Sequence, residues 1–185
     1  SPAEASTRVA LNPLSSPQRR YIREQGRLSS GLAADIVLQI AQALSAAHRK
    51  GIIHRDLKPA NIIVLYPEAG GGTRLMDFGL AKIHGAMQLT QAGMVAGSPS
   101  YIAPEVWKAK PFDHRIDVYS FGAVIFRALA GQPPFRGASM VDILMAATMG
   151  DRPKLTTFRS DLPDGIDEWV AKSLAIDASA RYPYV

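Results

Sequence analysis

The sequence predicts a mainly α-helical domain that carries one short β-hairpin. Three observations support this fold class. Apolar residues recur at helical spacing in four separate segments. Two short runs rich in β-branched and apolar residues flank a glycine-rich turn. The chain has 185 residues, of which 47% are hydrophobic and 20% charged, and this suffices for one domain with a sizeable core.

The first helix is expected over residues 31–50, after a loose segment over residues 1–18 that is rich in Ser, Pro and Ala and lacks periodicity. Ser29 or Ser30 can cap its N-terminus, and Gly51 suits the C′ position after its C-terminus. Its apolar positions are Leu32, Ile36, Ile40, Ala43, Leu44 and Ala47. Its last turn holds the cations that the helix dipole favours, His48, Arg49 and Lys50.

Two short strands are expected next, over residues 62–65 and 73–76, joined by a turn over residues 67–72. The turn contains three consecutive glycines. Their spacing does not match G-x-G-x-x-G and no helix signal follows them, so a flexible turn is favoured over a phosphate-binding loop. Because the strands form a hairpin, Asn61 and Asp77 are expected to lie at one site.

The second half of the chain predicts a long loop followed by helices. Residues 80–104 lack helical periodicity, and long loops inside compact domains are usually functional. Residues 114–130 form a helix that is apolar almost all round, which predicts burial, and Gly131 ends it. Two more helices are expected over residues 140–149 and 166–174.

Composition excludes several classes of function. The chain has no cysteine, which excludes disulfides, cysteine–zinc sites and thiol catalysis and fits a reducing compartment. The net charge of +5 is not accompanied by a basic patch interleaved with aromatic residues, so nucleic-acid binding is not expected. No run approaches the roughly 18 apolar residues of a membrane span, and no signal peptide is recognised.

Three short motifs carry the functional information. Residues 54–61 match the pattern H-R-D-x-x-x-x-N, residues 77–79 match D-F-G, and residues 103–105 match A-P-E. A single triplet recurs by accident, but three in this order do not. Over residues 20–185 the chain resembles the large, C-terminal lobe of serine/threonine protein kinases, and in particular bacterial members of that family. The resemblance implies ATP as phosphoryl donor, protein substrates and a cytoplasmic location, with a membrane anchor elsewhere in the parent left open.

The resemblance also assigns catalytic roles. Asp56 is expected to accept the proton of the substrate hydroxyl, and Lys58 to lie beside the transferred phosphoryl group. Asn61 and Asp77 are expected to hold two Mg²⁺ ions, with Mn²⁺ as an alternative, because hard cations prefer oxygen ligands.

Regulatory roles follow for the long loop. In relatives with Arg before the catalytic Asp, that Arg pairs with a phosphate on the activation loop, which suggests such a role for Arg55. Thr90 is the best candidate phosphate acceptor, although it equally fits an ordinary loop residue. Ser98 stands where many relatives have Thr, and its hydroxyl can still bond to Asp56 and Lys58.

The remaining motif positions are expected to be structural. Glu105 resembles an acid that pairs with a buried arginine, and Arg181 fits that partner. Asp117 resembles a helix aspartate that caps the backbone of the catalytic loop. The other structural positions are His54 and Phe78, expected to pack together, and Gly79.

Several kinase features do not precede the catalytic loop. No G-x-G-x-x-G-x-V loop, strand lysine or partner glutamate is found, so the expected object is a large lobe truncated at both ends, with its N-terminal lobe upstream of Ser1 and little activity of its own. Two alternatives compete. A non-catalytic scaffold lobe is disfavoured by the four intact catalytic and metal-binding residues, and a small-molecule phosphotransferase by the A-P-E motif and long loop.

Overall fold

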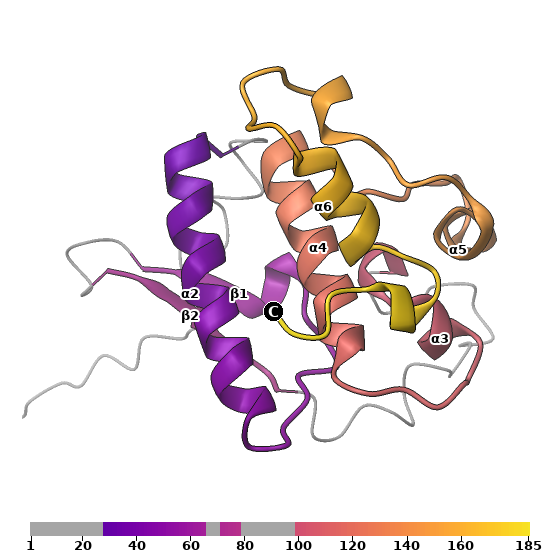
Figure 1. Ribbon diagram of the computed structural model, residues 1–185, viewed down its shortest axis with the longest axis horizontal. Helices are drawn as coiled ribbons and strands as arrows, with labels where there is room; N and C mark the ends of the chain where they lie inside the picture. The colour runs from indigo at the N-terminus through magenta and orange to yellow at the C-terminus, as the bar shows by residue number, and fades with distance from the viewer. Residues whose placement is uncertain (1–27, 66–70, 79–98) are drawn as a thin grey trace, which may run out of the picture.

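The computed structural model describes residues 28–65, 71–78 and 99–185 (Figure 1). Within these residues the protein is helix-rich with one small antiparallel sheet, as the sequence predicts. The helices are α2 (Ser30–His48), α3 (Pro104–Trp107), α4 (Arg115–Ala130), α5 (Met140–Met149) and α6 (Ile166–Ser173). The strands are β1 (Ile62–Val64) and β2 (Thr73–Leu75). Short 3₁₀ turns lie at Pro59–Asn61, Pro99–Tyr101, Leu155–Thr157 and Ala178–Ala180.

Helix α4 is the centre of the fold. Every residue from Ile116 to Phe126 is buried, and α2 and α6 pack on α4 from different sides (Figure 1). Gly122 allows the close approach of α6, because a Cβ atom there would lie 2.8 Å from the Cβ of Ser173. The helix ends at Gly131, which adopts φ 79°. The predicted buried helix and its glycine stop are therefore both confirmed.

Helix α2 begins where the sequence predicts and ends earlier. The side chain of Ser29 caps it by accepting a hydrogen bond from the Leu32 N–H. Its end forms a Schellman motif, in which the N–H of Gly51 donates to the His48 carbonyl and the N–H of Ile52 to the Ala47 carbonyl. Gly51 is left-handed at φ 71°, which confirms it as the C′ residue of this helix. The last residue of the helix is His48, two residues before the expected end at residue 50.

Helix α2 is also long and apolar enough, by length and composition alone, to cross a membrane. This is weak evidence, because core helices meet the same criterion. The spacing of its buried residues favours a core helix, since they form one face that belongs to the same core as α4. The face consists of Ala33, Ile36, Ile40 and Leu44.

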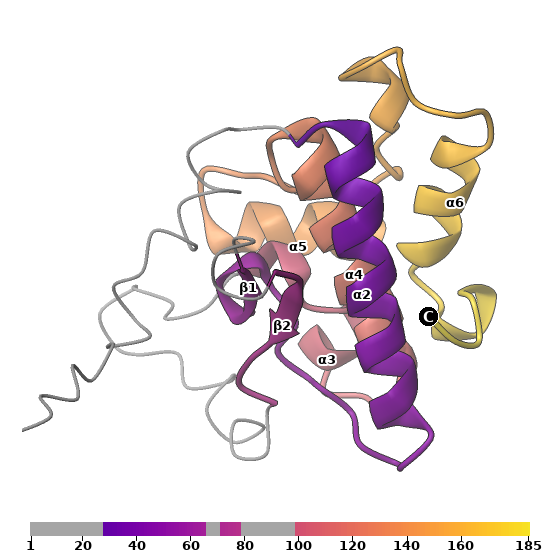
Figure 2. The same ribbon diagram turned by 90° about the vertical axis from the view of Figure 1, so that its left-hand side faces the viewer.

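The hairpin packs against α2 (Figure 2). It connects the loop over residues 54–61 to Asp77. Ile62 pairs with Leu75 and Val64 with Thr73, so both strands lie within the predicted ranges. The Thr73 N–H donates to the Gln39 side chain at 2.7 Å, which ties β2 to α2. The residues just outside the strands are joined as well, since the Met76 N–H donates to the Asn61 carbonyl at 2.8 Å.

Helix α3 lies beyond the predicted long loop and was not predicted from the sequence. It has only four residues, too few for an apolar period to show. Its end forms a Schellman motif, in which the N–H of Ala109 donates to Val106 and that of Lys110 to Glu105. Ala109 occupies the left-handed position at φ 50°, where glycine is usual.

Ala109→Gly is therefore expected to raise the free energy of unfolding by up to about 1 kcal/mol. The left-handed conformation costs an L-residue about 1–2 kcal/mol, and the greater freedom of glycine in the unfolded chain offsets about half of that. Urea denaturation of the intact protein measures the effect. The control is Ala34→Gly on the exposed side of α2, which is expected to lower stability by about 1 kcal/mol. Equal losses for both variants would contradict the strain at Ala109.

Candidate active site

A carboxylate of α4 accepts hydrogen bonds from the backbone of the loop over residues 54–61. Asp117 is fully buried, and its two oxygens accept the backbone N–H groups of His54 at 2.7 Å and Arg55 at 2.9 Å. Arg55 has φ 69°, a strained conformation for a residue with a Cβ atom. The two hydrogen bonds to Asp117 hold the loop backbone in that conformation, which supports the capping role expected for this residue.

Three polar side chains converge within this loop. The Lys58 Nζ donates to both carboxylate oxygens of Asp56, at 2.9 and 2.8 Å. The Asn61 Nδ2 donates to the Asp56 backbone carbonyl at 2.8 Å and to its Oδ2 at 3.1 Å. The side chains of Asp56 and Lys58 remain 29% and 19% exposed. A partly exposed carboxylate, fixed by an ammonium and an amide, is a suitable proton acceptor for a hydroxyl that approaches from solvent.

Asn61 and Asp77 both lie at the open end of the hairpin, because the strand register and the Met76–Asn61 hydrogen bond place Asn61 opposite Met76, the residue before Asp77. The amide nitrogen of Asn61 is used by Asp56, so its Oδ1 is the end that can face a cation. Asp77 is exposed and adopts φ 55°. An amide oxygen and a carboxylate fit Mg²⁺, which usually takes few protein ligands and completes its shell with water and phosphate oxygens.

No cluster of three or more His, Cys, Asp or Glu side chains suited to a metal occurs in the described ranges. Any metal held by Asn61 and Asp77 would therefore share the site with substrate oxygens, rather than sit in an all-protein cage.

His54 joins the loop to the D-F-G segment. Its Nε2–H donates to the Met76 carbonyl at 3.1 Å, and its Nδ1 accepts the Asp56 N–H at 3.4 Å. Its ring lies 4.5 Å from that of Phe78, centroid to centroid. Burial lowers the pKa of His54 below its usual 6.5, which favours the neutral ring that one donated and one accepted bond require.

Glu105 and Arg181 form a buried bidentate pair. The two guanidinium nitrogens donate to the two carboxylate oxygens at 2.6 and 2.7 Å. The guanidinium also lies 5.0 Å from the Tyr119 ring centroid and donates to three backbone carbonyls. These carbonyls belong to Arg115, Ala175 and Ile176. The pair thereby fastens the A-P-E segment to α4 and to the end of the chain.

The regulatory positions are only partly described. Arg55 is exposed, and no acidic side chain in the described part of the chain pairs with its guanidinium. Thr90, Ser98 and Gly79 lie outside the described residues, so their roles stay predictions.

One residue that contacts the site was not predicted from the sequence. His48 appeared there only as a cation at a helix end, yet its Nε2–H donates to the Asp117 Oδ2 at 2.8 Å. The partner is 69 residues away, so no local pattern could indicate the contact.

Comparison with known proteins gives a consistent result. A sequence profile described as a protein kinase domain matches residues 11–183. The serine/threonine-protein kinase PkaA of Streptomyces coelicolor is 42% identical over 127 residues, 68% of this chain and 23% of that protein. The probable serine/threonine-protein kinase PknB of Lactococcus lactis is 34% identical over 164 residues, 89% of this chain and 26% of that protein.

A third relative agrees with these two. The serine/threonine-protein kinase PknD of Mycobacterium tuberculosis (strain H37Rv) is 35% identical over 165 residues, 89% of this chain and 24% of that protein. The chain thus spans about a quarter of the length of the curated relatives that it matches.

Proposed function

This chain belongs to the protein kinase family, and we propose that it forms the large lobe of a serine/threonine-specific member. The observation that carries the proposal is the arrangement of Asp56, whose carboxylate receives hydrogen bonds from both Lys58 and Asn61. The reaction is transfer of the γ-phosphoryl group of ATP to the hydroxyl of a serine or threonine in a protein substrate.

Each residue has a distinct role in this reaction. Asp56 accepts the hydroxyl proton as the bond from the substrate oxygen to phosphorus forms and the bond from phosphorus to ADP breaks. Lys58 holds the Asp56 carboxylate in place and brings a positive charge to the side where phosphate charge develops. Asn61 and Asp77 would hold the metal ions. Bound Mg-ATP supplies the phosphoryl group and neutralises part of its charge, with Mn²⁺ as an alternative metal.

The proposal includes a second lobe that lies outside this chain. Asp56, Asn61 and Asp77 would supply a base and two metal ligands, but the described residues include no strand lysine paired with a helix glutamate for the α- and β-phosphates. A binding cleft with only one wall loses contacts to ATP and does not exclude water. We propose that an N-terminal lobe of the same kinase provides the other wall and that the domain acts in the cytoplasm on protein substrates.

Radiolabelled ATP with Mg²⁺ tests the function. The intact kinase is expected to label serine and threonine in a protein substrate and leave tyrosine unlabelled, whereas this chain alone is expected to show little or no transfer. Phosphoamino-acid analysis measures the first result and incorporated label the second. An intact protein that is inactive with both Mg²⁺ and Mn²⁺ would favour the scaffold alternative. Comparable turnover by the chain alone would overturn the need for a second lobe.

A further inference from the structure

The carboxylate that caps the catalytic loop has a third hydrogen-bond donor. Besides the backbone N–H groups of His54 and Arg55, Asp117 accepts the Nε2–H of His48 at 2.8 Å. Both side chains are almost fully buried, at 4% exposed for His48 and 1% for Asp117. A buried carboxylate depends on its donors, so the orientation of His48 affects how Asp117 holds the loop.

A second hydrogen bond does not fix the ring of His48. Its Nδ1 is buried and has no hydrogen-bond partner within the described residues. Histidines that serve as precise donors are usually oriented by a bond at the other ring nitrogen. The ring of His48 instead contacts the ring of His114. The two ring centroids lie 5.2 Å apart, with an angle of 58° between the planes.

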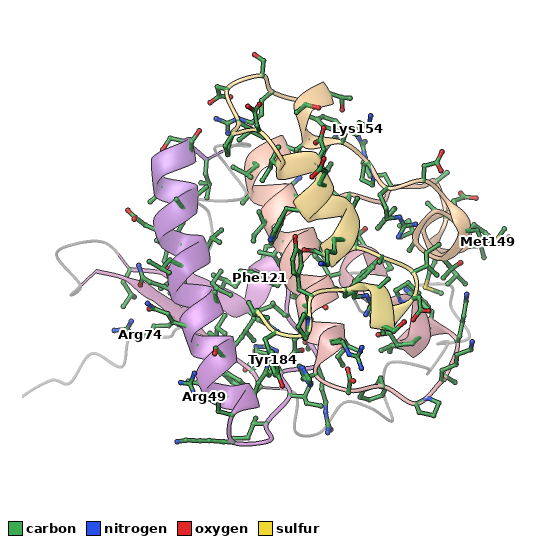
Figure 3. All side chains as sticks on the ribbon, in the orientation of Figure 1. Arg49, Arg74, Phe121, Met149, Lys154 and Tyr184 are labelled. Atoms are coloured by element: carbon green, nitrogen blue, oxygen red, sulfur yellow. The ribbon has the colours of Figure 1, made fainter. Side chains whose placement is uncertain are left out.

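His114 is itself fixed by the last residues of the chain. Its Nε2–H donates to the Pro183 carbonyl at 2.6 Å. Its ring stacks on Tyr184 at 5.2 Å and 14°. Figure 3 shows Tyr184 close to the end of α2 that carries His48 and to the start of α4. The contacts therefore continue from the C-terminal segment through two imidazoles to Asp117.

We propose that His114 is a positioning residue for the catalytic loop. It holds the His48 ring so that the Nε2–H stays on Asp117, and Asp117 in turn keeps Arg55 at its strained φ of 69°. The end of the chain thereby contributes to the geometry of Asp56 without touching the reacting atoms. The inference rests on the proposed function only for its effect on catalysis, because the backbone contacts exist whether or not the protein is active.

The test compares His114→Ala, His48→Leu and the double variant in the intact kinase. Hydrogen exchange of the backbone amides of His54 and Arg55 reports directly on the two bonds to Asp117. Each single variant is expected to speed this exchange about tenfold and to lower kcat about tenfold, with the KM for ATP unchanged. The double variant is expected to match His48→Leu, because His114 acts through His48.

Tyr182→Ala is the matched control. Tyr182 belongs to the same C-terminal segment, and its ring centroid lies 4.4 Å from the Lys172 ammonium, with no ring contact or hydrogen bond to His114 among the described residues. This variant is expected to loosen the segment and leave kcat and the two amides unchanged. If His114→Ala does not fold, His114→Phe keeps the ring contacts, loses the bond to Pro183, and is expected to show a smaller effect of the same kind.

Three outcomes would overturn the inference. The first is unchanged exchange at His54 and Arg55 in His114→Ala. The second is a double variant whose effects simply add. The third is a loss of kcat in Tyr182→Ala equal to that in His114→Ala. This would mean that any disturbance of the C-terminal segment lowers kcat, whether or not it involves His114. An inactive wild-type kinase would count against the proposed function alone. The exchange measurement would still show whether His114 affects the hydrogen bonds between Asp117 and the loop.

Discussion

Replacing Asp56 by asparagine is expected to lower the kcat of the intact kinase by about 10²–10⁴-fold, the usual contribution of a general base. Asparagine cannot take the proton of the substrate hydroxyl. Its amide would also turn N–H donors toward the Lys58 Nζ, which lies 2.8 and 2.9 Å from the two carboxylate oxygens. Steady-state kinetics with Mg-ATP and a serine-containing peptide measure the loss. The KM for ATP is expected to change little, because Asp56 is assigned to the hydroxyl and not to the nucleotide.

Asp164→Asn is the control for this experiment. Asp164 is an exposed carboxylate in the turn before α6, so the same change of charge is made away from the site. Its kcat is expected to equal that of the wild type. The melting temperature of Asp56→Asn is expected to stay close to normal, because the Asp56 side chain is 29% exposed and belongs to no apolar core. A folded Asp56→Asn enzyme with a near-normal rate would refute the role of Asp56.

Arg181→Met is expected to lower the free energy of unfolding by about 3–5 kcal/mol, a large share of the roughly 5–15 kcal/mol that stabilises a domain. Methionine fills much of the volume but leaves the Glu105 carboxylate buried without its partner. It also removes the donors to three backbone carbonyls. Thermal and urea denaturation of the intact protein measure the change.

Two further variants make the Arg181 result specific. Glu105→Leu combined with Arg181→Met is expected to recover part of the stability, because no unpaired charge then remains in the interior. Asp113→Asn breaks a more exposed ion pair, in which the side chain of Asp113 is 45% exposed and that of Arg115 31% exposed. This variant is expected to lower the free energy of unfolding by at most about 1 kcal/mol. A loss in Arg181→Met no larger than in Asp113→Asn would show that the buried pair contributes little.

The helices and strands were predictable where the pattern was long enough. Helix α4 buries an unbroken run from Ile116 to Phe126, and the hairpin is bounded by turn residues, so both gave clear signals. Helix α3 gave none, because four residues do not complete a recognisable apolar period. Helix α2 ends at His48, two residues before the expected end, and Gly51 takes the left-handed position after it as predicted.

The candidate site likewise has features that the local sequence indicates and others that it does not. Asp56, Lys58 and Asn61 lie within six positions of one another, so their identity and their proximity are both properties of one short segment. The hydrogen bonds from Lys58 and Asn61 to Asp56 span only two and five residues. The pairing of Glu105 with Arg181, across 76 residues, was expected only from the family resemblance, because no local spacing predicts it.

The sequence by itself determined the family and the helices with a full apolar period, and it predicts the residues of the candidate site. The reason is that these depend on residue type and short spacing. The role of Asp117 was expected only from the family resemblance, and only the tertiary structure shows that its carboxylate also accepts a hydrogen bond from His48, whose ring contacts that of His114. Those contacts join segments more than 60 residues apart, and they form because helices packed around α4 must satisfy the polar groups that they bury.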